Sequence, residues 1–100
     1  MGKYKLRIFP VAQNDLREIV EYLNTLSPAV AVSYYDLLVE QIGTLADMPE
    51  RCPLARDVQL RLRGYRALLV KNYFVFYVVN SNTVEIRRIL YARRQYENLL

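Results

Sequence analysis

The chain has 100 residues, of which 53% are hydrophobic, and a formal net charge of +4. This length predicts one domain spanning residues 1–100, with enough apolar side chains for a folded core. The sequence contains no histidine and one cysteine, Cys52, which excludes an intrachain disulfide, most histidine-dependent hydrolytic sites and most zinc sites. We expect no metal site. No apolar run approaches the ~20 residues of a membrane span and no cleavable signal precedes the fold, so we expect a cytoplasmic protein.

The charge is divided unevenly along the chain. Residues 1–50 carry four basic and seven acidic side chains, a net charge of −3. Residues 51–100 carry ten basic and three acidic side chains, a net charge of +7. A basic half of this kind is typical of a protein that binds a polyanion or an acidic partner.

The first half of the chain predicts one strand and two helices. Residues 3–9 alternate basic and apolar side chains with a period of two, the pattern of a half-buried strand. A proline then fits the first position of a helix, and apolar residues recur every three or four positions up to Leu26. Ser27-Pro28 predicts the start of a second helix, with serine as its N-cap, which we expect to end near Asp47. The two helices must fold back on each other as a hairpin.

The second half predicts a connecting loop followed by three strands. Residues 49–63 contain two prolines and several arginines, and residues 64–70, 73–79 and 83–91 have strand-like sequence. Lys71-Asn72 and Asn80-Ser81-Asn82 are the turns between these strands, and residues 93–100 are compatible with a short helix. This order predicts an α+β fold. One antiparallel sheet joins the N-terminal strand and a three-stranded meander, and the helical hairpin lies on one face.

Side-chain alternation leaves the orientation of the middle strand open. Tyr73 and Tyr77 share one face of this strand, Phe74 and Phe76 share the other, and either face is apolar enough to pack on the helices. Three further tyrosines lie at helical spacing and are expected in the core or at its rim: Tyr22, Tyr34 and Tyr35.

Arg87 and Arg88 are adjacent on the last predicted strand, so we expect their side chains to point to opposite faces of the sheet. The one that faces the helices needs an acidic partner such as Asp15 or Glu18, because a buried guanidinium without a counterion is costly. The other is then available to a ligand. We favour Arg88 for the functional role.

Four segments that follow one another in order carry a family resemblance. They are Pro10-x-Ala12-x-x-Asp15-Leu16-x-x-Ile19, Leu62-Arg63-Gly64-Tyr65-Arg66, Val70-Lys71-Asn72-Tyr73-Phe74-Val75-Phe76-Tyr77 and Ile89-Leu90-Tyr91-Ala92-Arg93-Arg94-Gln95-Tyr96. Together they resemble the RelE/ParE superfamily of bacterial type II toxins over essentially the whole chain. The resemblance implies the toxin component of a toxin–antitoxin system, which inhibits growth and is neutralised by a cognate antitoxin that covers its basic surface.

The superfamily has two main branches, and the resemblance is nearer to the ParE-like branch, which binds and poisons DNA gyrase without bond-making chemistry. The ending of that branch is matched by Leu90, Arg93, Arg94 and Tyr96, whereas Tyr91, Ala92 and Gln95 depart from it. The alternative is a RelE-like, metal-independent endoribonuclease that cleaves mRNA on the ribosome. Phe74 and Leu68 stand where the resemblance to active nucleases implies an arginine and a lysine.

The resemblance also implies the site residues. For target or antitoxin binding they are Arg66, Arg88, Tyr91, Arg93 and Arg94. We expect Arg66, Arg88 and Arg94 to converge on one edge of the sheet. In a nuclease, Arg66 and Arg94 hold phosphate and Tyr91 or Tyr96 handles a proton. Two other interpretations stay open: an inactive member that retains antitoxin binding, and a module that binds single-stranded nucleic acid through stacked aromatics. No interpretation involves a cofactor, and whether the chain is an enzyme stays undecided.

Overall fold

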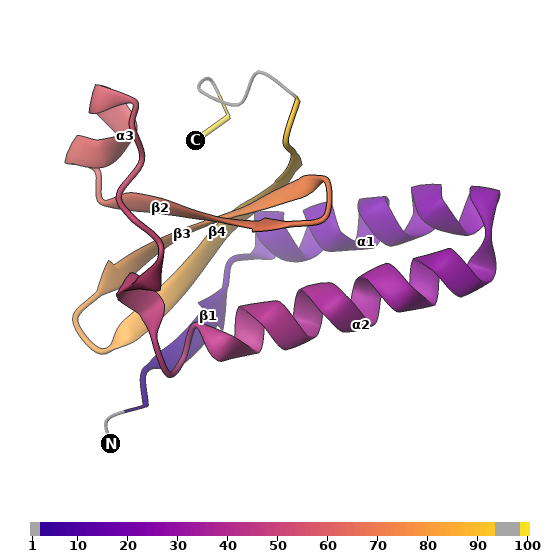
Figure 1. Ribbon diagram of the computed structural model, residues 1–100, viewed down its shortest axis with the longest axis horizontal. Coiled ribbons are helices and arrows are strands. Elements are labelled where there is room, and N and C mark those ends of the chain that lie inside the picture. The colour runs from indigo at the N-terminus through magenta and orange to yellow at the C-terminus, as the bar shows by residue number, and fades with distance from the viewer. Residues whose placement is uncertain (1–2, 94–98) are drawn as a thin grey trace.

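The computed structural model describes residues 3–93 and 99–100. A hairpin of two long helices, α1 (Pro10–Leu26) and α2 (Pro28–Thr44), packs on one face of a four-stranded sheet (Figure 1). The strands are β1 (Lys5–Ile8), β2 (Tyr65–Val70), β3 (Tyr73–Asn80) and β4 (Thr83–Tyr91). The predicted α+β architecture and order of long elements are confirmed.

The sheet is mixed, which corrects one detail of the prediction. The strand order is β1-β4-β3-β2, and β1 runs parallel to β4, with Lys5 opposite Thr83 and Ile8 opposite Ile86. The meander of β2, β3 and β4 is antiparallel, as expected. The helical hairpin brings the chain back to the starting end of β1, where Tyr4 N–H donates to the Ala46 carbonyl at 2.8 Å. β2 therefore runs in the direction of β1, and the two antiparallel turns of the meander give β4 this same direction, so β1 and β4 pair in parallel.

Local signals in the sequence set the boundaries of both long helices. Prolines occupy the first helical position of α1 and of α2, where a missing N–H group is not needed. The Ser27 hydroxyl oxygen accepts a hydrogen bond from Val30 N–H at 3.3 Å and caps α2, as predicted. Only Ser27 separates the two helices, and α2 ends at Thr44, three residues before the predicted end.

The segment predicted as a loop contains two short helices. A 3₁₀ turn covers Pro49–Arg51, and helix α3 covers Val58–Leu62. Asp57 caps α3, because its Oδ1 accepts a hydrogen bond from Leu60 N–H at 3.0 Å. Leu60 is buried beneath the sheet, and this single apolar anchor explains why a segment rich in prolines and arginines still forms a helical turn.

The two faces of the sheet pack on different partners. Tyr73, Val75 and Tyr77 lie in the main core beneath α1 and α2, which settles the orientation of β3. A second, smaller core lies on the opposite face, where α3 and the end of the chain cover the sheet (Figure 1). Its buried members are Leu60, Tyr65, Phe76 and Leu90, with Phe74 and Val78 packed around them.

Candidate functional site

A β-bulge in β4 sets the direction of the two adjacent arginines. Phe76 of β3 lies opposite Arg88, and the register then shifts so that Arg87 is an extra residue in β4. Arg87 donates a hydrogen bond from Nη1 to the hydroxyl of Tyr65 at 3.3 Å, and both Tyr65 and Phe76 belong to the second core. Both arginines therefore leave β4 on the face away from α1 and α2. The expected opposite orientation is wrong because the bulge interrupts the alternation.

Arg88 forms a two-pronged ion pair with Asp15 of α1. Arg88 Nε and Nη2 donate to the two carboxylate oxygens of Asp15 at 2.8 and 2.9 Å, and Nη1 donates to the carbonyl of Leu99 at 3.2 Å. The Asp15 carboxylate also accepts a hydrogen bond from Ile89 N–H at 3.0 Å, so it caps the free edge of β4 beyond β1. The hydrogen bond with Asp15 raises the pKa of the Arg88 guanidinium. Asp15, one of the two acids expected for a helix-facing arginine, is thus the partner of Arg88, the arginine that we favoured for binding a ligand.

Arg87 is held by an acid and two aromatic rings. Its Nη2 donates to Glu85 Oε1 at 2.8 Å, and its guanidinium carbon lies 4.8 Å from the ring centroid of Phe9 and 5.6 Å from that of Tyr65. Glu85 is buried, and its hydrogen bonds from Arg87 hold the pKa of the carboxyl below its usual value. Arg87 therefore stabilises the second face of the sheet through charge and cation–π contacts.

Arg66 lies apart from Arg88. It sits opposite Tyr77 of the main core, whereas Arg88 lies opposite Phe76 of the second core, so the two side chains leave the sheet on different faces. The Arg66 guanidinium donates to the carbonyl of Cys52 and ties the connecting segment to β2. The expected convergence of these two arginines is therefore not present in the structure.

The other predicted site residues lie at or beyond the end of β4. Tyr91 is the last residue of β4 and is 44% exposed, and Arg93 is also exposed. Arg94 and Tyr96 lie outside the described residues, as does most of the predicted terminal helix. Ala92 N–H donates to the carbonyl of Asn72 at 2.8 Å, which places the end of β4 beside the turn between β2 and β3.

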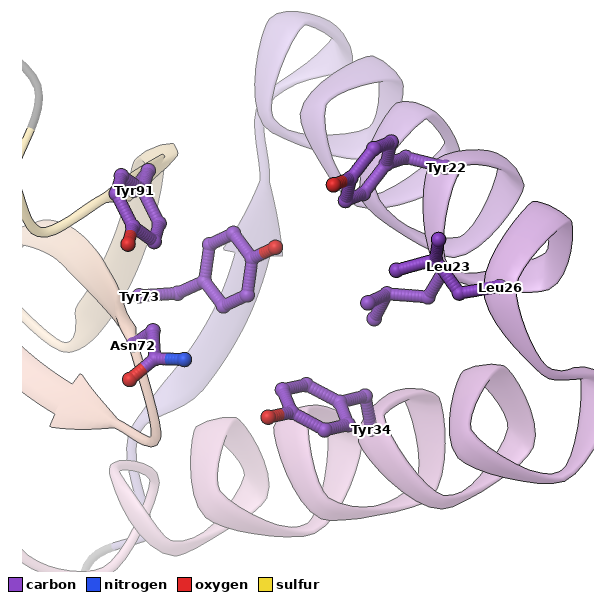
Figure 2. A pocket seen from close by; sticks show the side chains of 7 residues that line it. All are labelled: Tyr22, Leu23, Leu26, Tyr34, Asn72, Tyr73 and Tyr91. Atoms are coloured by element: carbon purple, nitrogen blue, oxygen red, sulfur yellow. The ribbon is translucent and has the colours of Figure 1, made fainter.

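Tyr91 lines a pocket of about 520 Å³ between the sheet and the tip of the helical hairpin, which we call the tyrosine pocket. Figure 2 shows side chains from α1, α2, β3 and β4 turned into this space. Its lining consists of four tyrosines and three other residues: Tyr22, Tyr34, Tyr73, Tyr91, Leu23, Leu26 and Asn72. Both neighbours of the Tyr73 ring are edge-on, Tyr91 at 5.8 Å and Tyr34 at 6.3 Å between centroids.

The four tyrosine hydroxyls in this pocket influence one another. Burial raises the pKa of Tyr73, and the nearby Tyr34, Tyr22 and Tyr91 raise it further. Tyr73 therefore stays neutral and keeps a hydroxyl that donates and accepts hydrogen bonds. Tyr22 and Tyr34 were expected in the core or at its rim, and the pocket that they line was not predicted. The spacing of Tyr22 and Leu26, one helical turn apart near the end of α1, was the available signal.

Two of the arginines implied as site residues have partners within the protein. The guanidinium groups of Arg66 and Arg88 are engaged by protein groups, and Phe74 packs on the second core. The exposed groups near the end of β4 include an aromatic ring, Tyr91, and two charges, Arg93 and Lys71 of the neighbouring turn.

The fold has known relatives. One solved structure, a chromosomal ParDE toxin–antitoxin system from P. aeruginosa, contains a chain that is 19% identical, with a TM-score of 0.78, over 93% of this chain and 100% of that one. A second, the toxin–antitoxin complex RelBE2 from Mycobacterium tuberculosis, gives 24% identity and a TM-score of 0.61 over 89% of this chain and 98% of that one. Both likenesses show the fold.

Three further observations concern the class of protein. Among curated protein sequences, none matches this chain significantly. Within residues 3–93 and 99–100, no helix has the length and apolar character needed to cross a bilayer. The sequence model of one protein family, described as the ParE toxin of the parDE type II toxin–antitoxin system, matches residues 6–96 of this chain. The chain therefore belongs to the ParE toxin family of type II toxin–antitoxin systems.

Proposed function

We propose that this toxin acts by binding DNA gyrase and stabilising its cleaved complex with DNA, and that a cognate antitoxin neutralises it. The family match supports a ParE-type mode of action, and both similar structures are of toxin–antitoxin systems or complexes. The basic second half of the chain, with a net charge of +7, suits an acidic antitoxin segment.

The observation that carries the proposal is that Arg66 and Arg88, two of the arginines implied as site residues, are engaged in structural contacts. Arg88 is paired with buried Asp15, and Arg66 holds the connecting segment. Phe74, which stands where the resemblance to active nucleases implies an arginine, packs on the second core and supplies no charge for a phosphate. A toxin that works by binding requires only an exposed and complementary surface.

The proposed gyrase-binding surface is the exposed end of β4. Tyr91 presents part of its ring there, and Arg93 extends into solvent beside it. Arg94 follows directly in the sequence, so we include it in the same surface. An aromatic ring next to arginines is the composition of many interface hot spots, because the ring contributes buried area and the guanidinium contributes directional hydrogen bonds.

The test is a supercoiling assay with purified protein, gyrase, ATP and relaxed plasmid. We expect supercoiling to be inhibited and linear plasmid to accumulate. Arg93→Ala should weaken both effects, whereas Arg56→Ala, an exposed arginine of the connecting segment, should leave them unchanged. Normal supercoiling with folded protein would contradict the proposal and direct the search to mRNA on programmed ribosomes.

A further inference from the structure

The tyrosine pocket differs chemically from the rest of the site. Its lining holds four phenol rings, two leucines and the Asn72 amide, and no lysine or arginine is among these residues. Figure 2 shows Tyr22 and Tyr73 with their hydroxyls directed toward one another, and Tyr91 on the side of the sheet. At about 520 Å³, its volume falls within the range of roughly 300–1,000 Å³ usual for small-ligand sites. The lining therefore combines aromatic surface with neutral hydrogen-bond acceptors.

Acidic side chains flank this pocket on two sides. A smaller hollow of about 170 Å³ shares Tyr22, Tyr73 and Tyr91 with it and is also lined by Asp15 and Glu18. Because Asp15 is already paired with Arg88, Glu18 supplies the charge on this side, and it is exposed.

The second flank lies along α2. A hollow that shares Tyr34 with the tyrosine pocket is lined by Asp36 and Glu40, with Lys71 as the one basic residue among its lining side chains. Over α1 and α2 together, five acidic residues stand against the single base Arg17. The surface around the pocket is thus acidic although the chain as a whole is basic.

We propose that the tyrosine pocket binds an arginine side chain of a partner protein. The faces of tyrosine rings attract cations, and a planar guanidinium can stack on one ring while it donates in-plane hydrogen bonds to hydroxyls and to an amide oxygen. The flanking carboxylates favour a positive ligand and disfavour a negative one. Tyr91 belongs both to this pocket and to the proposed gyrase-binding surface, whereas Arg93 is not among the residues that line the pocket.

Small neutral and charged probes test this assignment directly. The full-length protein, labelled with ¹⁵N, is titrated at low ionic strength with N-acetyl-arginine amide, N-acetyl-citrulline amide or N-acetyl-leucine amide, and amide shifts are followed by NMR. Citrulline has the shape of arginine without its charge. We expect saturable shifts centred on Tyr22, Asn72, Tyr73 and Tyr91 with the arginine probe, and about tenfold weaker binding of the citrulline probe.

Matched tyrosine variants locate the binding. Tyr22→Leu removes a ring that is 60% exposed and should weaken arginine binding by about two- to fivefold without unfolding the protein. Tyr91→Leu should do the same from the β4 side. Tyr35→Leu, at an exposed tyrosine of α2 outside the pocket, should change nothing.

Three results would overturn the proposal: no saturable shift with the arginine probe, equal binding of the citrulline or leucine probe, or equal effects of Tyr22→Leu and Tyr35→Leu. The inference does not depend on gyrase as the target. A failure here would leave the supercoiling result unaffected, and a negative supercoiling result would leave arginine binding unaffected.

Discussion

Replacing Asp15 by alanine is the sharpest test of how the helices are joined to the sheet. In the folded protein the Asp15 carboxylate accepts two hydrogen bonds from Arg88 and one from Ile89 N–H. Asp15 is only 7% exposed. Asp15→Ala leaves the Arg88 guanidinium, whose side chain is 17% exposed, without its counterion. It also leaves the Ile89 amide at the free edge of β4 without an acceptor.

The expected fall in the free energy of unfolding follows from these two losses. Removing one partner of a buried ion pair costs about 3–5 kcal/mol. An unsatisfied buried N–H costs about 1–3 kcal/mol, and the two losses overlap because both come from one carboxylate. We therefore expect the free energy of unfolding to fall by about 4 kcal/mol, out of the roughly 5–15 kcal/mol usual for a domain. At about 4–8 °C per kcal/mol, the melting temperature should drop by about 15–30 °C.

Urea unfolding followed by circular dichroism at neutral pH measures this difference. The control is Glu21→Ala, which breaks the exposed Arg17–Glu21 pair of 2.9 Å on the same helix and should cost less than about 0.5 kcal/mol. The double variant Asp15→Ala/Arg88→Ala should cost less than the sum of its two single changes, because neither charge is then left unpaired. A loss below about 1 kcal/mol for Asp15→Ala, or strict additivity in the double variant, would refute this account.

Three other predictions concern pH and backbone geometry. Arg87 lowers the pKa of the Glu85 carboxyl in the folded state. The ionised carboxylate therefore stabilises the protein above the ordinary pKa of a glutamate, and this contribution is lost as the pH falls. Glu85→Gln should flatten the loss of stability between about pH 5 and pH 3. Burial and the Cys52 thiol raise the pKa of Tyr77 in the folded protein, so the free energy of unfolding should fall above about pH 10. Tyr77→Phe should flatten this alkaline loss. At neutral pH this variant should cost about 1–2 kcal/mol, because it lacks the 2.6 Å hydrogen bond to the Pro49 carbonyl. Gly64→Ala should destabilise by about 1 kcal/mol because φ there is +81°, whereas Gly43→Ala, in the last turn of α2 with open space around it, should stabilise by up to about 1 kcal/mol.

Urea midpoints measured across the pH range check the first two of these predictions. Parallel acid slopes for wild type and Glu85→Gln would contradict the first, and a Tyr77→Phe variant as sensitive to alkali as wild type would contradict the second. The glycine pair is checked at one pH by the difference between the two variants. Equal effects would show that the left-handed conformation of Gly64 carries no strain for alanine.

Local patterns predicted most of the secondary structure. The prolines at the first position of α1 and α2, the Ser27 cap and the alternation of β3 are all decided within a few residues of the chain, so they could be predicted from the sequence. Helix α3 could not, because its stability comes from Leu60 packed under the sheet, a contact made only in the folded protein.

The site depended on geometry that the sequence does not display. The bulge at Arg87 reversed the expected side of one arginine, and nothing in the local sequence marks where β3 and β4 lose register. Asp15 was named as a partner for one of the two arginines because a buried guanidinium needs a counterion, but Arg88 was expected to be the arginine left available to a ligand. The tyrosine pocket was missed because its four rings come from both helices and two strands, which the fold alone brings together.

The parallel pairing of β1 with β4 governs when the chain can complete its fold. Lys5 lies opposite Thr83, so the first strand waits for a partner that is synthesised 78 residues later (83 − 5 = 78). Contacts of such long range are slow to form, since the loop between them must close first. During synthesis the helical hairpin emerges long before the strand to which Asp15 and β1 attach. A ribosome that stops before β4 is made therefore releases a chain that lacks the strand between β1 and β3, and such a product cannot complete the sheet.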